Sequence, residues 1–246
     1  MTPAAVIVIV NYNSGDHLVR ALASIRAHAP TAETVVIDNA SNDGSEQRAV
    51  GVPRVTLVRH ATNAGFAAGV NLGARTAAAL GAREAPLLLI NPDGVLTAGA
   101  LDRLLQELVQ HPECGVAAPT IRNDDGSLQG SVRGDPTMLT GLFGRTTLLT
   151  KLLPNNRLAQ RNVMTAAASG SESRTADWVS GACMLVRRAA FDAVGGFDEQ
   201  YFMYWEDADF CRRLRARGYT TRYVPTAIVS HVVGGSSGGA ARSLTI

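Results

Sequence analysis

Three groups of polar side chains follow apolar runs in the first half of the sequence, where buried strands would end. These groups are Asn11-Tyr12-Asn13, Asp38-Asn39 and Asn91-Pro92-Asp93. One polar strand end is ordinary turn chemistry, but parallel α/β proteins bind ligands beyond the carboxyl ends of their strands. Together the three groups therefore predict a cleft that hydrogen-bonds a polar ligand. The Asp93 carboxylate could also hold a hard divalent cation, with phosphate oxygens as further ligands.

A second group of charged side chains opens a predicted helix near the end of the chain. Glu206, Asp207 and Asp209 follow a run of aromatic residues, and the helix dipole favours carboxylates at this position. Asp209 can form an ion pair with Arg212 or Arg213, three and four positions further on. Asp207 has no cationic side chain at these spacings, so it is a candidate general base.

The elements that must position these side chains alternate between strands and helices over residues 1–120. Strands are predicted at residues 5–10, 34–37, 55–58, 87–90 and 115–118, and helices at residues 15–28, 66–80 and 100–110. Strands that are apolar throughout are typical of a mostly parallel sheet with helices on both faces. Glycines recur every fourth residue at Gly65, Gly69 and Gly73, which predicts close packing of that helix against the sheet.

The pattern changes in residues 121–246. A strand is predicted at residues 183–186, a helix at 206–217, and strands at 219–224 and 227–232. Residues 136–171 contain leucines and four basic residues but no acidic residue. That segment could lie on an anionic membrane surface, or it could fold its leucines into the core. Because no linker or repeat divides the chain, we predict a single α/β domain whose second half is elaborated.

Composition excludes several classes of protein. The 246 residues are 46% hydrophobic and 18% charged, as in ordinary globular proteins, and the net charge of +2 gives no support for a nucleic-acid partner. The three cysteines, Cys114, Cys183 and Cys211, are far apart, which argues against a disulfide scaffold or a zinc site. Residues 1–3 lack the basic start of a signal peptide, and no apolar run reaches the roughly 18 residues of a membrane span. We therefore expect a cytoplasmic protein, with peripheral attachment to the membrane left open.

Short motifs recur in order along nearly the whole chain. They lie at residues 8–13, 36–45, 63–71, 89–93, 178–188, 195–199 and 201–209, and at His231. In this series the chain resembles the family two glycosyltransferases, which are inverting enzymes with the GT-A fold. It is most similar to a rhamnosyltransferase-like branch that acts on lipid-linked sugars. Each motif alone is weak, but their ordered series is specific.

The resemblance implies a binding site for a nucleotide-sugar donor in residues 1–120. The matching positions are Asn11, Tyr12, Asn13, Asp38, Asn39, Asp43, Asn63, Gly65, Asn71, Asn91 and Asp93. Asp38 would accept a hydrogen bond from the nucleotide base. Asp93 would hold Mg²⁺ or Mn²⁺, with His231 as a second contact to the metal or the diphosphate; a packed strand-end histidine remains the alternative for His231. Asn91 departs from the family's DxD motif, because it replaces the first Asp.

The resemblance also implies that residues 121–246 bind the acceptor and carry the catalytic base. Asp207 matches the base, and Trp178, Gly181, Trp205 and Glu206 match the acceptor side. The implied reaction moves L-rhamnose from dTDP-L-rhamnose to a hydroxyl of a saccharide, with inversion. The implied acceptor is a polyprenyl-diphosphate-linked sugar in cell-wall or surface-polysaccharide synthesis.

Three alternatives stay open. A nucleotidyltransferase would need a basic, glycine-rich loop after the first strand, and residues 11–15 carry no charge. A non-catalytic sugar-nucleotide-binding or scaffold protein would bind the donor without transfer, although Asp93 and Asp207 are both present. Relatives in this branch usually continue beyond the position of Ile246, so a truncated glycosyltransferase is the third.

Overall fold

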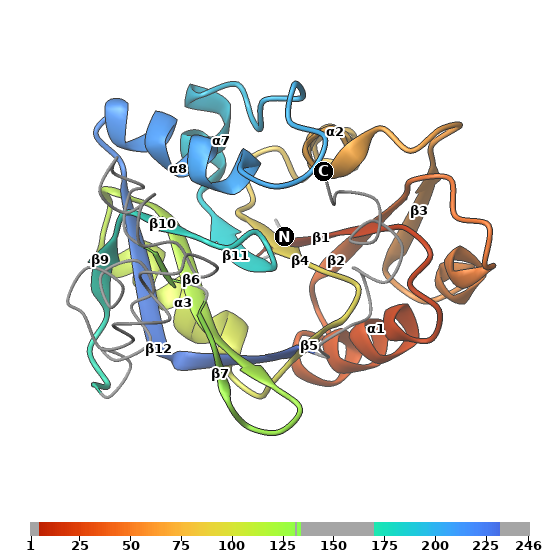
Figure 1. Ribbon diagram of the computed structural model, residues 1–246, viewed down its shortest axis with the longest axis horizontal. Coiled ribbons are helices and arrows are strands. Elements are labelled where there is room, and N and C mark those ends of the chain that lie inside the picture. The colour runs from red at the N-terminus through yellow and green to blue at the C-terminus, as the bar shows by residue number, and fades with distance from the viewer. Residues whose placement is uncertain (1–4, 131, 134–169, 232–246) are drawn as a thin grey trace, which may run out of the picture.

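The computed structural model describes residues 5–130, 132–133 and 170–231, in which helices cover a ten-stranded sheet and two further short strands, at residues 132–133 and 178–179, form a separate pair (Figure 1). The main strands are β1 (Val6–Asn11), β2 (Glu33–Asp38), β3 (Val55–Arg59), β4 (Leu87–Ile90), β5 (Gly94–Leu96), β6 (Cys114–Asn123), β11 (Cys183–Val186) and β12 (Thr220–His231). The short strands are β7 (Leu128–Gln129), β8 (Val132–Arg133), β9 (Arg174–Ala176) and β10 (Trp178–Val179). The helices are α1 (His17–His28), α2 (Gly65–Ala79), α3 (Ala100–Gln110), α7 (Arg188–Ala193) and α8 (Glu206–Ala216), with a 3₁₀ turn η1 (Ser45–Ala49).

The strand order of the sheet is β3-β2-β1-β4-β11-β6-β12-β5. The four strands β3, β2, β1 and β4 are parallel to one another. β11 is antiparallel to its neighbours β4 and β6, whereas β6 and β12 pair in parallel. The sheet is therefore parallel in its first part and mixed in its second, and two strands from the second half of the chain, β11 and β12, lie between strands from the first half.

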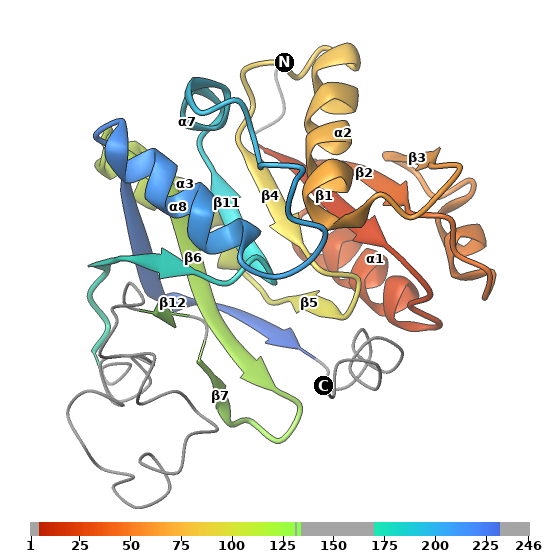
Figure 2. The same cartoon turned by 45° about the horizontal axis from the view of Figure 1, so that its top comes forward.

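Alternate residues of the strands face two cores, one on each side of the sheet. Figure 2 shows α1 and α2 on opposite sides of β1 and β2. On β1, Val6 and Val8 belong to the core shared with α2, α7 and α8, whereas Ile7 and Ile9 belong to the core shared with α1 and α3. Burying each such side chain contributes about 1.5–3 kcal/mol. This two-sided burial explains why β1 is apolar along almost its whole length.

Several predicted boundaries agree with the structure, and others are wrong. β4, α3 and β11 have the predicted bounds. The predicted short strand at 115–118 is the longer β6, and the three-residue strand β5 was not predicted. The two predicted strands at 219–224 and 227–232 are one strand, β12, with a register shift between Val224 and Ile228. Pro225 lies in that interval, and a proline has no N–H to donate to a ladder, so the apolar pattern breaks although the strand continues.

The glycines of α2 play two different roles. A Cβ on Gly69 would lie 2.7 Å from Val10 Cγ1, and one on Gly73 would lie 2.4 Å from Val8 Cγ1. These contacts confirm the close packing of the helix on the sheet. Gly65 instead meets the loop before α8, since a Cβ there would lie 2.4 Å from the carbonyl oxygen of Phe202.

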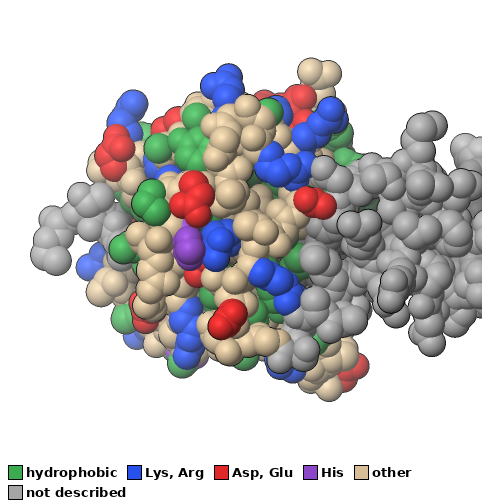
Figure 3. All heavy atoms as spheres, turned by 90° about the vertical axis from the view of Figure 1, so that its left-hand side faces the viewer, with side chains coloured by type: hydrophobic (Ala, Val, Ile, Leu, Met, Phe, Trp, Pro, Cys, Tyr) green, Lys and Arg blue, Asp and Glu red, His purple; other side chains and the backbone are tan. Residues whose placement is uncertain are grey.

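Part of the sequence prediction falls outside the described residues. The basic, leucine-rich segment 136–171 lies there except for its last two residues. Within the ranges that are described, no helix is both long and apolar enough to cross a membrane. On the face in Figure 3, basic side chains are interspersed with acidic ones. The division of the domain after residue 120 stays a prediction, and that position lies inside β6.

Candidate active site

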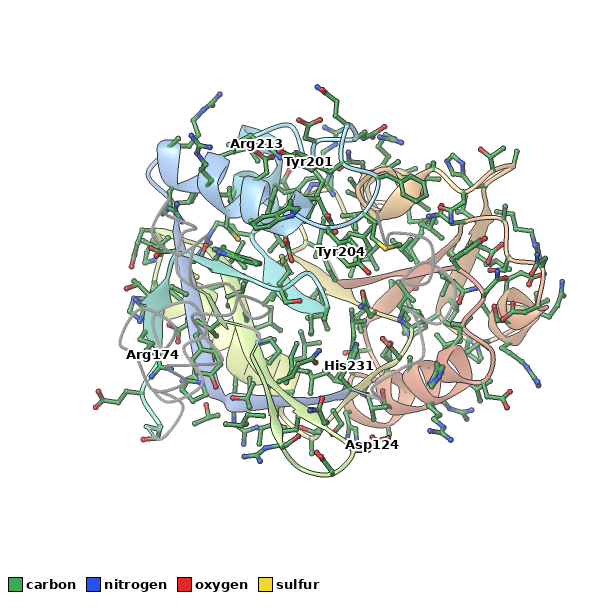
Figure 4. The ribbon with its side chains drawn as sticks, viewed as in Figure 1. Asp124, Arg174, Tyr201, Tyr204, Arg213 and His231 are labelled. Carbon is green, nitrogen blue, oxygen red and sulfur yellow. The ribbon has the colours of Figure 1, made fainter. Side chains whose placement is uncertain are left out.

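A cavity of about 510 Å³ lies beyond the carboxyl ends of β1, β2 and β4. One wall carries predicted donor residues, and the opposite wall carries predicted acceptor-side residues and the predicted base. The predicted residues that line it are Tyr12, Asn39, Asn63, Gly65, Asn91, Trp178, Gly181, Trp205, Glu206 and Asp207. In Figure 4, Tyr204 lies near the centre of the molecule, between the sheet and the loop that leads into α8. The structure thus gathers ten predicted positions from both halves of the chain around one cavity.

Asn11 and Asp38 form a buried network beside this cavity rather than part of its lining. Asn11 Nδ2 donates to Asp38 Oδ1 at 2.8 Å, and Asn11 itself has no exposed surface. The Asp38 carboxylate also accepts from the hydroxyl and the backbone N–H of Ser41. These bonds hold the ends of β1 and β2 together. Asn11 is therefore placed to position Asp38, and direct contact of either residue with a nucleotide stays a prediction.

Asp43 and Asn13 brace the two loops that follow β1 and β2. Asp43 accepts from the backbone N–H groups of Gly15 and Ser45 at 2.8 and 2.9 Å. Partial burial opposes ionisation of Asp43, but the hydrogen bonds from Ser45 and Gly15 outweigh it and lower the pKa of the carboxyl group. Asn13 Oδ1 accepts from the N–H of Asn42 at 2.8 Å. Neither Asn13 nor Asp43 lines the cavity, and both lie in the loops that follow β1 and β2.

Asn71 lies elsewhere than a donor-lining residue would. It is buried on α2, donates from Nδ2 to the carbonyl of Phe197 and to Glu199, and accepts from the N–H of Phe197. It is absent from the lining of the cavity. Asn71 therefore bridges α2 and the loop after α7, and its contact with a donor stays a prediction.

Asn39 and Gly65 join the donor wall to the loop before α8. Asn39 Nδ2 donates to the carbonyl of Gly65 at 2.9 Å, and Asn63 Oδ1 accepts from the N–H of Gly65 at 3.0 Å. The next N–H, of Phe66, donates to the carbonyl of Phe202 at 3.0 Å. This contact between the two loops needs glycine at position 65, because Gly65 has a φ of +87° and its surroundings leave no room for a Cβ.

Asp93 and His231 lie in contact with each other, and neither lines the cavity. His231 Nε2 lies 2.9 Å from Asp93 Oδ1, and the two residues are 8% and 2% exposed. The pairing of β12 with β5 brings them together, because His231 is in register with Gly94. A carboxylate oxygen and an imidazole nitrogen are both metal ligands, so the pair fits a divalent cation. Among the described residues no third His, Cys, Asp or Glu joins them.

Asp207 lies in the first turn of α8, and its carboxylate faces the cavity. Oδ2 accepts from the N–H of Gly181 at 3.0 Å, and Oδ1 accepts from the N–H of Ala208 at 2.8 Å. Two backbone donors therefore fix the orientation of the carboxylate towards the cavity. Asp209, in contrast, forms the expected ion pair with Arg213, at 2.6 Å. Arg213 also donates to the carbonyls of Val194 and Gly196, so Asp209 has a structural role.

Glu206 carries a buried carboxyl group and is the first residue of α8, the helix that also carries Asp207. It is 7% exposed, and its Oε2 has no hydrogen-bond partner within the described part of the chain. Burial raises the pKa of Glu206 from 4.5 to about 7, and the neighbouring charge of Asp207 acts in the same direction. The cavity therefore contains one carboxyl group that is fixed by backbone donors and another that titrates near neutral pH.

Glu206→Gln is expected to stabilise the fold by about 1–3 kcal/mol at about pH 8 and to change little at about pH 5. The native pKa lies above the unfolded value, so the wild type loses stability as pH rises from 4.5 to about 7. Glutamine does not ionise and escapes that loss. Urea unfolding of both proteins at the two pH values measures the difference. Glu84→Gln, an exposed control, should show no such pH dependence; an equal effect of Glu206→Gln at both pH values would contradict the assignment.

The loop before α8 was recognised only as an aromatic run, and its geometry was not predicted. Tyr204 and Trp205 have φ values of 71° and 72°. Non-glycine residues in this left-handed region cost roughly 1–3 kcal/mol each and cluster at functional sites. Met203, Tyr204 and Ser180 line the cavity without having been predicted. They lie within the motifs at residues 178–188 and 201–209, which did not single them out.

Comparisons with known proteins agree with this geometry. Residues 3–245 match the family model described as "Glycosyltransferase like family 2". The chain is 37% identical over 253 residues to an N-acetylglucosaminyl-diphospho-decaprenol L-rhamnosyltransferase of Mycobacterium tuberculosis, covering 97% of this chain and 79% of the relative.

Two solved structures share the fold at low sequence identity. GalNAc-T7 with UDP, GalNAc and Mn²⁺ gives a TM-score of 0.66 at 16% identity, covering 94% of this chain and 44% of the other. Mannosyltransferase PcManGT from Pyrobaculum calidifontis, in complex with GDP-Man and Mn²⁺, gives 0.60 at 17% identity, with 95% and 58% covered. The chain thus spans about half the length of these two proteins. The expected GT-A fold is confirmed, and the chain belongs to glycosyltransferase family 2.

Proposed function

We propose that this chain transfers L-rhamnose from dTDP-L-rhamnose to a hydroxyl group of a polyprenyl-diphosphate-linked saccharide, with inversion. The observation that carries the proposal is the position of Asp207, which faces a cavity shared with the donor wall and is oriented by two backbone N–H groups. The rhamnosyltransferase of Mycobacterium tuberculosis, whose name gives an N-acetylglucosaminyl-diphospho-decaprenol, supports the choice of sugar and acceptor.

The residues that line the cavity have different roles in an inverting transfer. The donor lies along the wall formed by Tyr12, Asn39 and Asn63, with its diphosphate towards Asp93. Asp207 accepts the proton of the acceptor hydroxyl as that oxygen attacks the anomeric carbon, a step worth about 10²–10⁴-fold. Attack from the side opposite the leaving nucleotide inverts the anomeric centre and needs no covalent intermediate on the protein.

A divalent cation, Mg²⁺ or Mn²⁺, would be held by Asp93 and His231. When bound it would supply positive charge to the leaving diphosphate. The geometry supports this assignment because the two side chains are buried and lie 2.9 Å apart at one edge of the sheet. In the absence of a cation they form an ion pair when His231 is protonated.

The proposal is tested by transfer to a short-chain acceptor, N-acetylglucosaminyl-diphosphoryl-citronellol. The donors compared are dTDP-rhamnose, UDP-glucose and GDP-mannose, each with Mg²⁺, Mn²⁺ or EDTA. We expect a disaccharide product from dTDP-rhamnose only, and only with a divalent cation. Transfer from another donor would overturn the choice of sugar. A melting-temperature rise with dTDP-rhamnose but no product would support the non-catalytic alternative.

The lipid-linked acceptor implies a working position at the cytoplasmic face of the membrane. Contact with the membrane surface through residues 136–171 stays a prediction, since nearly all of that segment lies outside the described residues.

A further inference from the structure

A series of contacts begins at Asn39, on the donor wall of the cavity, and ends at Asp207 on the opposite wall. We propose that Asn39 is a positioning residue for the base: its amide holds the start of α2, residues 65–66, against the backbone segments that orient Asp207. This inference rests on the proposed function, because Asp207 accepts the proton in that reaction. It concerns a contact within the protein and adds to the donor contact that the sequence resemblance implies for Asn39.

Asn39 is held firmly at the end of β2. It is 2% exposed, and its backbone N–H donates to the carbonyl of Asn11 at 2.8 Å. Its Nδ2 donates to the carbonyl of Gly65 at 2.9 Å. Because a carbonyl oxygen can only accept a hydrogen bond, the Gly65 carbonyl determines which end of the amide faces α2.

The other end of this amide lacks a partner. Oδ1 of Asn39 is buried and accepts no hydrogen bond within the described ranges, although Asn39 lines the cavity. A buried acceptor without a partner costs free energy, and a ligand N–H or O–H in the cavity would remove that cost. Rotation of the amide would present a donor instead of Oδ1. The bond to Gly65 therefore decides which group Asn39 offers to a ligand, and it links the two walls.

The backbone at the start of α2 carries the link to the loop before α8. The N–H of Phe66 donates to the carbonyl of Phe202 at 3.0 Å, and Figure 2 shows this loop beside the start of α2. The first N–H groups of a helix have no partner within the helix. The bond from Phe66 to Phe202 is therefore a contact between the helix and the loop, and it depends on the position of residues 65–66.

The ring of Phe66 carries a second link, to the backbone that orients Asp207. A Cβ placed on Gly181 would lie 3.3 Å from Phe66 Cε1 and 3.7 Å from Asp207 Cβ. The N–H of Gly181 is the group that donates to Asp207 Oδ2, at 3.0 Å. Phe66, Gly181 and Asp207 thus lie side by side at the cavity. A shift of Phe66 would disturb both contacts, and a displacement of about 1 Å can cost 10²-fold in rate.

Asn39→Ala tests this role through the way its effect divides between kcat and KM. With saturating dTDP-rhamnose and the short-chain acceptor, kcat should fall about tenfold to 10²-fold, because the base is displaced. Loss of a contact made only with the donor would raise the donor KM and leave kcat unchanged. Asn42→Ala is the matched control, since Asn42 is exposed in the same loop, and its kcat should stay within about twofold. A normal kcat with a raised donor KM in Asn39→Ala would overturn the inference.

Hydrogen exchange of the Phe66 amide, resolved by NMR, tests the link without turnover. In Asn39→Ala this amide should exchange about tenfold faster or more, while the amide of Ala74, in the middle of α2, keeps its rate. A general loss of stability would accelerate both amides together. An unchanged rate at Phe66, or equal acceleration of both amides, would overturn the inference.

Two glycine variants of α2 provide an independent check of the same link. Gly65→Ala places a Cβ against the carbonyl of Phe202 and should also accelerate exchange at Phe66. Gly69→Ala is its control, because a Cβ there meets Val10 on the sheet and not the loop. Equal acceleration at Phe66 in the two variants would contradict the link through residue 65.

The kinetic and exchange measurements separate this inference from the proposed function. Faster exchange at Phe66 in Asn39→Ala, in a protein that transfers no rhamnose, supports the link from Asn39 and overturns the proposed reaction. Rhamnosyl transfer with an unchanged kcat in Asn39→Ala supports the reaction and overturns the positioning role.

Discussion

Asp207→Asn is expected to lower the rate of sugar transfer by about 10²–10⁴-fold, the usual contribution of a general base, while the affinity for dTDP-rhamnose stays the same. Asparagine has nearly the same shape, and its carbonyl oxygen can still accept the N–H of Gly181 that Oδ2 of Asp207 accepts at 3.0 Å. It loses the capacity to take a proton from the acceptor hydroxyl and, in addition, the hydrogen bond that Oδ1 accepts from Ala208. Single-turnover transfer and a donor thermal-shift titration measure the two quantities separately.

Asp209→Asn is the matched control for that substitution. Asp209 lies on the same helix two residues later, but it pairs with Arg213 at 2.6 Å, away from the reacting groups. This variant should lose some stability and keep a turnover within a few-fold of the wild type. If Asp207→Asn retained normal turnover, or if both variants lost transfer equally, the assignment of the base would be wrong.

Asp93→Asn is expected to reduce turnover by about 10²–10³-fold, because several kcal/mol of charge stabilisation on the leaving diphosphate depend on the bound cation. The asparagine keeps one oxygen but removes the negative charge next to His231 Nε2. The concentration of Mn²⁺ needed for half-maximal donor-induced thermal shift should therefore rise. That readout does not require turnover.

The control for this second prediction is Asp124→Asn. Asp124 is exposed on the turn after β6, and Figure 4 places it near the same end of the molecule as His231. It should leave the metal dependence unchanged. If the Asp93→Asn variant needed no more Mn²⁺ than the wild type, the assignment of the metal site to Asp93 and His231 would be wrong.

The parts of the site that were predictable are those set by local pattern. Tyr12, Asn39 and Asn91 follow continuous apolar strands, so their place beyond the sheet follows from periodicity and topology. Likewise, Asp209 pairs with Arg213 at a helical spacing that can be read directly.

Other features depend on contacts between distant segments, which no local pattern encodes. The meeting of Asp93 and His231 requires the register of β5 with β12, and β5 is too short to show a period of its own. The hydrogen bonds between Asn71 and the loop after α7 join residues more than 120 positions apart, so the sequence did not reveal them. The left-handed backbone at Tyr204 and Trp205 is held by tertiary contacts against the preference of those residue types.

The place of β11 between β4 and β6 limits how enzymes of this shape can be recombined. A chimera joined near residue 120 would cut through β6 and would exchange β11, the strand that pairs with the last parallel strand of the donor half. The predicted donor and acceptor halves therefore share one sheet and cannot be exchanged as separate modules. Exchanging the whole second half to change the acceptor would also replace strands that lie between those of the first half.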